Sequence, residues 1–393
     1  MITNPPTTLA PTLVNGTIAG INPNQVVFAP FGLNAFSFEG KIPTVYNYSL
    51  GVQTKLPYEL LLDVAYVGSA SRHLLQRLNI NPVPYGATFL PQNQDTTKNA
   101  NVPLGSRAFD ADFLRQFQGF GSITLHQMGG TSNYNSLQVG LNRRFARGLF
   151  FGLAYTWSKA LATVTNDGDF IRIDGNTRLA NYGPAGFDRR HNFSINYIYE
   201  LPNIARRFGA DNKFTRAVFD GWQISGITRF QSGNPYGVGF SINNINNQNL
   251  TGSNTEPARV RLIGDPLAGT SDDPFRRLNP AAFGAPFVGS IGLDAPVNYL
   301  TAPGVNNWDL TLQKSFSIKE DVRIQLRADA FNVFNHTQFS GINSTINFAN
   351  PGSATPTNLP FNADGSLRDR NGFGTVSGAR DPRIMQLVVR LEF

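Results

Sequence analysis

Histidine is the side chain most often used for proton transfer near neutral pH, and the chain contains 4 histidines. His191 follows Asp188 closely, and such a pair beside a serine could form a hydrolytic triad. The sequence contains no Gly-x-Ser-x-Gly motif, which marks the nucleophile of many hydrolases. We therefore expect His191 to be a polar residue at a strand end, hydrogen-bonded to loop backbone, in a protein that is not an enzyme. A hydrolase is the alternative.

Carboxylates gather in the segment Asn166–Asn176, which contains Asp167, Asp169 and Asp174 among glycines. Oxygen ligands of this kind could hold calcium. Their spacing does not match an EF-hand loop, and Arg172 lies among them, so we expect a solvated turn and keep calcium as the alternative. The chain has no cysteine, which excludes disulfides, cysteine-based zinc sites and thiol catalysis. We expect neither a metal nor a cofactor.

The chain is basic, with a formal net charge of +7 and a pI near 9.7. Its arginines are scattered in short groups at segment ends, as at Arg189–Arg190 and Arg276–Arg277. A nucleic-acid-binding protein usually gathers its charge in one patch or stripe. We therefore expect no nucleic-acid partner.

The elements that would position these residues are strands, because apolar and polar residues alternate with period two in many segments. No apolar run approaches the roughly 18 residues of a membrane helix, and no long segment keeps a helical period. The clearest alternation lies in Ile384–Phe393 and Val322–Ala330. The predicted strands are Tyr46–Gln53, Glu59–Val67, Tyr134–Arg143, Leu149–Trp157, Phe193–Tyr199, Gly221–Gln231, Trp308–Phe316, Val322–Ala330 and Ile384–Phe393.

The strand lengths and connections favour a transmembrane antiparallel β-barrel. The strands have roughly ten residues each, against five or six in soluble sheets and 9–11 for a tilted membrane strand. Aromatic residues such as Trp157, Trp222 and Trp308 lie near strand ends, as in the aromatic girdles of such barrels. The alternative is a large soluble β-sandwich or propeller. The predicted long connections are Gly68–Asn133, Ser158–Arg190, Ser232–Asn306 and Phe334–Arg383. They alternate with connections of short or moderate length, Thr54–Tyr58, Arg144–Gly148, Glu200–Asp220 and Ser317–Asp321.

Outer-membrane barrels have short periplasmic turns and long extracellular loops, so this alternation predicts a topology. The last strand would run toward the periplasm, and residues 1–44 would form an irregular extracellular segment before barrel residues 45–393. The odd number of strands, together with the lack of a signal peptide, leads us to expect that the chain is a piece of a larger barrel.

A set of short motifs, in their order and spacing, resembles the C-terminal barrel of TonB-dependent outer-membrane receptors, in particular the Oar-like group. The resemblance extends from about Ile42 to Phe393. The motifs are Ile42–Lys55 (IPTVYNYSLGVQTK), Tyr66–Leu74 (YVGSASRHL), Tyr134–Arg144 (YNSLQVGLNRR), Tyr155–Ala160 (YTWSKA), Phe187–Phe193 (FDRRHNF), Tyr199–Pro202 (YELP), Asp220–Trp222 (DGW), Phe331–Phe339 (FNVFNHTQF) and Arg380–Phe393.

The resemblance implies a partial barrel from a family whose full barrel has 22 strands around an N-terminal plug. It implies location in the cell outer membrane and a part in the energy-coupled passage of a ligand, whose identity the sequence does not indicate. The implied partners are outer-membrane lipid, the barrel-assembly machinery, and TonB and the plug through an N-terminal part that this sequence lacks. A passive porin or an adhesin-like structural barrel is the alternative.

Two groups of residues are candidates for these roles. The last strand places Leu387, Val389, Leu391 and Phe393 on one face, and this pattern resembles the signal that the barrel-assembly machinery recognises. Arg323, Gln325, Arg327 and Asp329 should face the barrel lumen, because a charge facing lipid costs about 2–4 kcal/mol at the membrane midplane. Lys314 falls on the lipid-facing side near the periplasmic end, where we expect it to extend into the headgroups.

Overall fold

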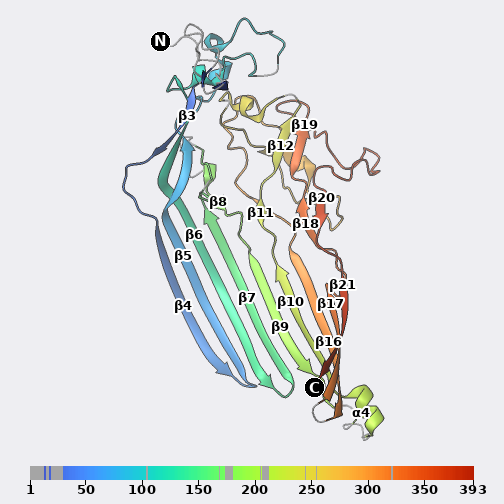
Figure 1. The fold of residues 1–393 in the computed structure, drawn as a ribbon. Helices are drawn as coiled ribbons and strands as arrows, with labels where there is room; N and C mark the ends of the chain where they lie inside the picture. Colours follow the sequence, from blue (N-terminus) through green and yellow to red (C-terminus); the bar gives the residue numbers. More distant parts are fainter. Residues whose placement is uncertain are drawn as a thin grey trace.

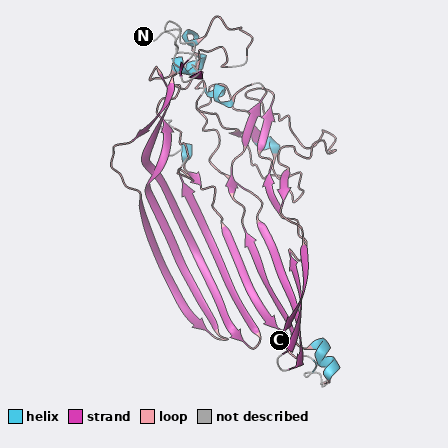
Figure 2. Cartoon of the chain, in the orientation of Figure 1, coloured by secondary structure: helices cyan, strands magenta, loops and turns pink. Residues whose placement is uncertain are grey.

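The computed structural model describes residues 30–102, 105–167, 169–172, 180–203, 205, 212–243, 245–253, 255–319 and 322–393, together with the short strands β1 (Leu13–Val14) and β2 (Thr17–Ile18). Within these residues the fold is almost entirely β, and the few helices are short (Figure 2). No helix among them has the length and hydrophobicity that crossing a membrane requires.

One large curved sheet contains all of the predicted strand segments (Figure 1). It has 11 strands, of which β3 (Phe31–Phe36) and β8 (Gly183–Pro184) lie off the main path. All neighbours along the main path are antiparallel. In spatial order the path is β21 (Ile384–Glu392), β17 (Val322–Phe331), β16 (Val305–Lys319), β10 (Trp222–Gln231), β9 (His191–Glu200), β7 (Leu149–Ala162), β6 (Phe120–Ala146), β5 (Leu60–Asn79) and β4 (Thr44–Leu56).

The sheet is open, because no pairing among the described residues joins β4 to β21. Short connections link neighbouring strands at one end, which we call the turn end, and long connections emerge at the other, the loop end (Figure 1). The β6–β7 turn consists of Arg147 and Gly148, both with positive φ (52° and 77°). A side chain at Gly148 would lie 2.9 Å from the Glu200 carbonyl oxygen, so this tight turn requires glycine.

Strands β5 and β6 are much longer than predicted, at 20 and 27 residues. Their pairing continues from Leu60–Arg143 to Asn79–Thr124, so much of the predicted loop Gly68–Asn133 is a continuation of the hairpin. Ten or eleven residues suffice to cross a membrane, so most of this extension lies outside it. In this extension the backbone hydrogen bonds continue, and Leu74, Leu78 and Leu125 pack with Val164 and Ile171 of the next connection in a small apolar cluster. Within residues 1–44, β3 also pairs with β6, in parallel.

The two faces of the sheet differ in polarity along the whole path. The pairing places Leu310 beside Gly226 and Ala330, and Leu312 beside Ile224 and Ala328, on an apolar face. The opposite face carries their sequence neighbours, which are mostly polar. Across β9, β10, β16 and β17 this polar face includes Asn192, Ser194, Asn196, Gln223, Ser225, Arg229, Asp309, Thr311, Gln313, Ser315, Arg323, Gln325, Arg327 and Asp329.

Two of the long connections, 232–304 and 332–383, fold together into a compact unit at the loop end, which we call the loop domain. Strand β12 (Gly239–Ile242) of the first pairs in parallel with β19 (Thr345–Phe348) of the second. Phe283, Ile346 and Phe348 are fully buried in a shared apolar core, which we did not predict. The other short pairs are β11 (Pro235–Tyr236) with β15 (Leu300–Thr301), β13 (Arg261–Leu262) with β14 (Phe283–Gly284), and β18 (Phe339–Ile342) with β20 (Val376–Ala379).

The helical elements are short and peripheral. The four-residue α1 (Ala111–Leu114) lies in the β5–β6 connection, and α4 (Lys213–Phe219) lies in the β9–β10 connection at the turn end. The 3-10 helices η1 (Ala87–Phe89), η2 (Pro91–Asn93), η3 (Asn247–Thr251) and η4 (Pro280–Ala282) all lie in loop-end connections.

Candidate functional site

The four residues predicted to face the lumen alternate along β17 and share the polar face. Asp329 pairs in register with Thr311, and Arg327 with Gln313, both on β16. Thr311 donates its hydroxyl proton to Asp329 Oδ1 at 2.6 Å, and Arg327 Nε donates to the same oxygen at 2.7 Å. The Asp329 side chain is 7% exposed, whereas that of Arg327 is 49% exposed. The carboxylate is therefore held in the wall, and the cation extends from it.

This pair forms one side of a shallow hollow on the polar face, with a volume of about 340 Å³. The hollow extends across four neighbouring strands, and Asn196, Ser225, Asp309 and Thr311 contribute to it with Arg327 and Asp329. Asp309 also accepts a hydrogen bond from the Asn332 backbone at 2.9 Å. The acidic groups here are thus engaged by neighbouring donors, and Arg327 presents the positive charge.

Arg323 and Gln325 lie nearer the turn end and are not part of this hollow. In register, Arg323 is opposite Ser317 and Glu392, and Gln325 is opposite Ser315 and Arg390. Neither side chain forms a hydrogen bond with a described residue, in contrast to the Arg327–Asp329 pair. Of the four candidates, Arg327 and Asp329 form an ion pair, whereas the side chains of Arg323 and Gln325 bond to none of the described residues.

The predicted assembly-signal residues lie on the edge strand of the sheet. Leu387, Val389 and Leu391 occupy one face of β21 and are 81%, 73% and 56% exposed. Phe393 follows the end of the strand and is 95% exposed. Their roles as a recognition signal and as lipid contacts stay predictions.

The residues considered for catalysis do not form a triad. His191 Nδ1 lies 2.8 Å from the Tyr155 hydroxyl, and the His191 backbone N–H donates to Ser232 Oγ. Asp188 is buried and accepts a hydrogen bond from the Ala160 backbone at 2.7 Å. The histidine side chain is thus hydrogen-bonded to a tyrosine on the neighbouring strand, and its backbone contacts the loop residue Ser232.

Of the carboxylates considered for calcium, Asp169 is engaged by backbone donors. Asp169 Oδ2 accepts hydrogen bonds from the backbone of Thr165 and Asn166 at 2.7 and 2.8 Å, which closes a turn. Arg172 contacts Glu256, in another loop. No cluster of potential metal ligands occurs among the described residues, and Asp174 lies outside them.

Lys314 was predicted to extend into the lipid headgroups, and the structure shows a different arrangement. Its side chain is buried against the sheet, where the ammonium lies 4.7 Å from the centre of the Phe316 ring and 5.6 Å from that of Trp222. It donates a hydrogen bond to the main-chain oxygen of Asp220. A nearby carbonyl at the end of α4 therefore takes the place that a lipid headgroup would have taken.

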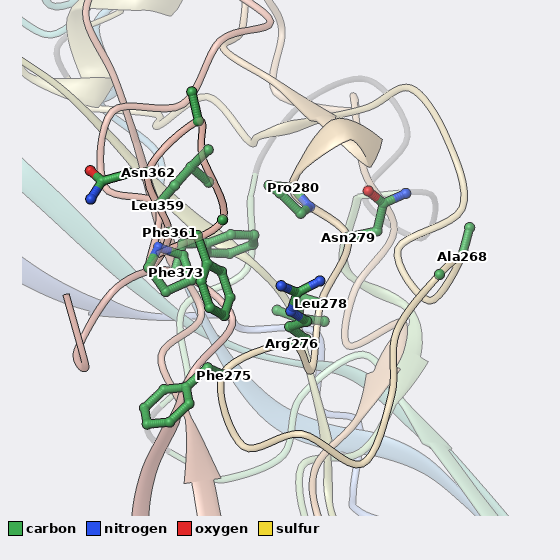
Figure 3. Close-up of a pocket in the computed structure, with 14 residues that line it drawn as sticks. Ala268, Phe275, Arg276, Leu278, Asn279, Pro280, Leu359, Phe361, Asn362 and Phe373 are labelled. Atoms are coloured by element: carbon green, nitrogen blue, oxygen red, sulfur yellow. The ribbon is translucent and has the colours of Figure 1, made fainter. Parts of the chain in front are cut away.

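The loop domain contains a cavity of about 370 Å³ between its two connections. Figure 3 shows Phe361 and Phe373 on one side, with Arg276, Leu278 and Pro280 facing them. The Arg276 guanidinium lies 4.4 Å from the centre of the Phe361 ring and remains exposed. An aromatic wall next to a cation suits an amphipathic ligand that carries negative charge.

We did not predict this cavity, because the long connections were expected to be loops. A signal was present, since Phe240 with Ile242 and Ile346 with Phe348 keep the strand period within these connections. Buried aromatic residues in long polar loops indicate a folded unit, whereas scattered hydrophobic residues on a surface need no explanation.

An amphipathic antiparallel sheet with long strands and one-sided long loops is the architecture of an outer-membrane barrel. The sequence matches the family model described as an outer membrane beta barrel domain over residues 2–386, and the chain belongs to this family. The family places the protein in the cell outer membrane and confirms the predicted location. It also agrees with the all-β, antiparallel fold class.

No curated protein sequence matches the chain. Among solved structures, it is similar to the outer membrane transporter YddB from Escherichia coli, with 11% identity and a TM-score of 0.41 over 91% of this chain and 34% of that one. It is also similar to the siderophore receptor PiuA from Acinetobacter baumannii, with 11% identity and a TM-score of 0.38 over 88% of this chain and 28% of the receptor. The chain thus spans about a third of the length of these proteins.

Proposed function

We propose that the chain forms part of the barrel wall and outer loops of a TonB-dependent receptor of the Oar-like group, which binds a ligand outside the cell and takes part in its passage across the outer membrane. The observation that carries this proposal is the loop domain. Two long connections share a buried core and enclose a cavity on one end of an amphipathic sheet. A passive pore has no need of a folded unit of this kind on its outer rim.

In this proposal the turn end faces the periplasm and the loop end faces the outside, as the lengths of the connections favour. The apolar face contacts lipid, and the polar face, with Arg323, Gln325, Arg327 and Asp329, lines the lumen. There Arg327, Arg323 and Gln325 are available to a plug domain or to a passing ligand, since the side chains of the last two bond to none of the described residues. Further strands would complete the barrel between β4 and β21, because an unpaired edge in lipid costs several kcal/mol for each exposed backbone group.

The cavity of the loop domain is the proposed ligand contact, and its lining suits an anionic ligand with an aromatic or other apolar part. The protein is not proposed to be an enzyme, and no cofactor is assigned to it. A porin or adhesin is the second candidate, on the observation that the polar face carries mostly polar and charged residues, interrupted by Ile198 and Ile227, which would suit a water-filled lumen.

Ion conductance separates the two candidates. The full-length gene product is incorporated into planar lipid bilayers in potassium chloride solution. A plugged, energy-coupled receptor is expected to give no steady conductance, whereas a porin gives stable open channels. Stable channels from the full-length protein would overturn the receptor proposal.

The cavity is tested with anilinonaphthalene sulfonate, an anionic aromatic dye whose fluorescence rises in apolar sites. Replacement of Phe361 by Ala, or of Arg276 by Gln, is expected to lower dye binding several-fold. The matched control is Phe287→Ala, because Phe287 also lies under an arginine, Arg261, at 4.0 Å, but outside this cavity. Equal binding by all three variants and the parent protein would contradict the proposed site.

A further inference from the structure

The helix α4 occupies an unusual place for a connection at the turn end. The β4–β5 and β6–β7 connections there are tight turns, whereas β9 and β10 are joined by residues 201–221, which include α4. The helix has its own capping box, in which Asn212 Oδ1 accepts from the Thr215 backbone and Thr215 Oγ1 from the Asn212 backbone. Local sequence therefore starts this helix at a defined residue.

The end of α4 is attached to the apolar face of the sheet by two side chains. Trp222 of β10 and Lys314 of β16 are partners in register and share that face with Ile224, Leu312 and Phe316. Trp222 Nε1 donates to the Val218 carbonyl oxygen at 2.8 Å, and Lys314 donates to the Asp220 carbonyl oxygen. Both contacts satisfy carbonyl groups at the C-terminal end of the helix, where a cation is also favoured.

The attachment sets the position of the helix. Because both anchoring side chains extend from the apolar face, α4 lies on the side of the wall that faces lipid and not over the lumen. Figure 1 shows it beyond the strand ends, at the turn end near the C-terminus. Glycine is required where the chain leaves the helix, since Gly221 has a φ of 74° and a Cβ there would lie 2.8 Å from the Ser315 carbonyl oxygen.

The helix exposes large apolar side chains at this position. Phe214, Val218 and Phe219 are 77%, 42% and 49% exposed. Arg216 is exposed on the same helix. An aromatic and basic short helix beside a membrane wall has the composition of an interfacial anchor.

We propose that α4 lies in the headgroup region of the periplasmic leaflet, with Phe214, Val218 and Phe219 inserted among phospholipid acyl chains and Arg216 near lipid phosphates. The occupant is phospholipid because this surface continues the lipid-facing apolar face of β10 and β16 directly, through Trp222 and Lys314. The inference rests on the proposed orientation of the sheet, with its apolar face toward lipid.

The lack of cysteine allows a direct test, because single cysteines can carry spin labels without background. Label positions are Val218→Cys on the apolar side of α4 and Arg216→Cys, about 160° away around the helix. Leu312→Cys reports the apolar face of the wall, and Arg370→Cys, at an exposed position of the loop domain outside its cavity, is the aqueous reference. The full chain is reconstituted in liposomes of phosphatidylethanolamine and phosphatidylglycerol, and collisions with oxygen and with a water-soluble nickel complex are measured.

The label at 218 is expected to give an oxygen-to-nickel collision ratio at least about threefold above those at 216 and 370, since an interfacial helix is inserted by roughly 5–10 Å. A ratio at 218 equal to that at 370 would place α4 in water. Low collision rates with both reagents would indicate that protein covers it. Either result overturns the proposal. If the label at 312 is lipid-exposed in such a case, the barrel orientation stands and only the α4 proposal fails; if 312 also behaves as aqueous, the orientation itself is wrong.

Discussion

Arg172 and Glu256 belong to different loop-end connections, and their charged groups lie 3.6 Å apart with both side chains only 11% exposed. The same guanidinium donates to the carbonyl oxygens of Ile291 and Gly292 at 2.7 and 2.8 Å, and to the Tyr85 hydroxyl. Arg172 thus joins three connections: the one after β5, the one after β7 and the one after β10. The outer loops are held together by this residue as well as by their apolar core.

Replacement of Arg172 by Met should open the outer loops without unfolding the sheet. Removing one partner of a buried ion pair costs about 3–5 kcal/mol, and such a cost makes loop opening roughly a hundredfold to several thousandfold more frequent. Limited proteolysis of the membrane-embedded protein measures this opening. Glu256→Gln keeps the shape and should have a smaller effect. Equal cleavage rates for Arg172→Met and the parent protein would show that the apolar core alone holds the loops.

The loop domain should lose stability at high pH. Burial raises the pKa of Tyr236 to about 12, with a further contribution from the nearby Tyr299, whose own pKa burial also raises to about 12. An unfolded tyrosine ionises near pH 10, so the folded domain retains these protons when the unfolded chain releases them. Stability is therefore unaffected by these groups below about pH 10 and falls between about pH 10 and 12.

Absorbance of tyrosinate during a pH titration measures this effect. The parent protein should show a late-ionising component that decreases in Tyr236→Phe and in Tyr299→Phe. If both variants keep the late component unchanged, the late ionisation belongs to other tyrosines and the assignment is wrong.

Substitution by arginine should have a large effect at one of two adjacent residues of β16 and a small effect at the other. Leu312→Arg places a charge on the apolar face and should destabilise the membrane-inserted protein by about 2–4 kcal/mol if the side chain is near the midplane. Gln313→Arg places it on the polar face and should cost little. Urea titration of both variants in lipid vesicles gives the free energies of unfolding. A larger cost for Gln313→Arg would reverse the assignment of the two faces.

Loss of the terminal aromatic ring should impair assembly. Replacement of Phe393 by Ser is expected to lower, several-fold, the amount of protein that reaches the outer membrane in cells, because an aromatic end residue at the interface anchors the terminal strand. The neighbouring Glu392→Gln change is the control. The measurement is the membrane-inserted fraction resolved by heat-dependent electrophoretic migration. Normal insertion of the Phe393→Ser protein would remove the assembly role from this residue.

The sequence by itself determined the strands and their two faces. Alternation along Val322–Ala330 is a local property, since successive side chains of a strand point to opposite faces whatever it pairs with. For the same reason, the grouping of Arg327 with Asp329 on one face could be read directly. The one-sided distribution of long connections was also visible, because it depends only on the order of the strands.

Only the tertiary structure determined how the outer loops pack together, how far the β5–β6 pairing extends and where α4 lies. The contact of Arg172 with Glu256, and that of Arg276 with Phe361, join residues far apart in sequence, and no local period encodes them. Strands β5 and β6 extend beyond the predicted bounds because their pairing continues to Asn79, where the extension packs against Val164 and Ile171 of the next long connection. Lys314 donates to the Asp220 carbonyl oxygen because the fold places the end of α4 beside β16. This acceptor is distant in sequence, so the pattern of β16 alone does not indicate it.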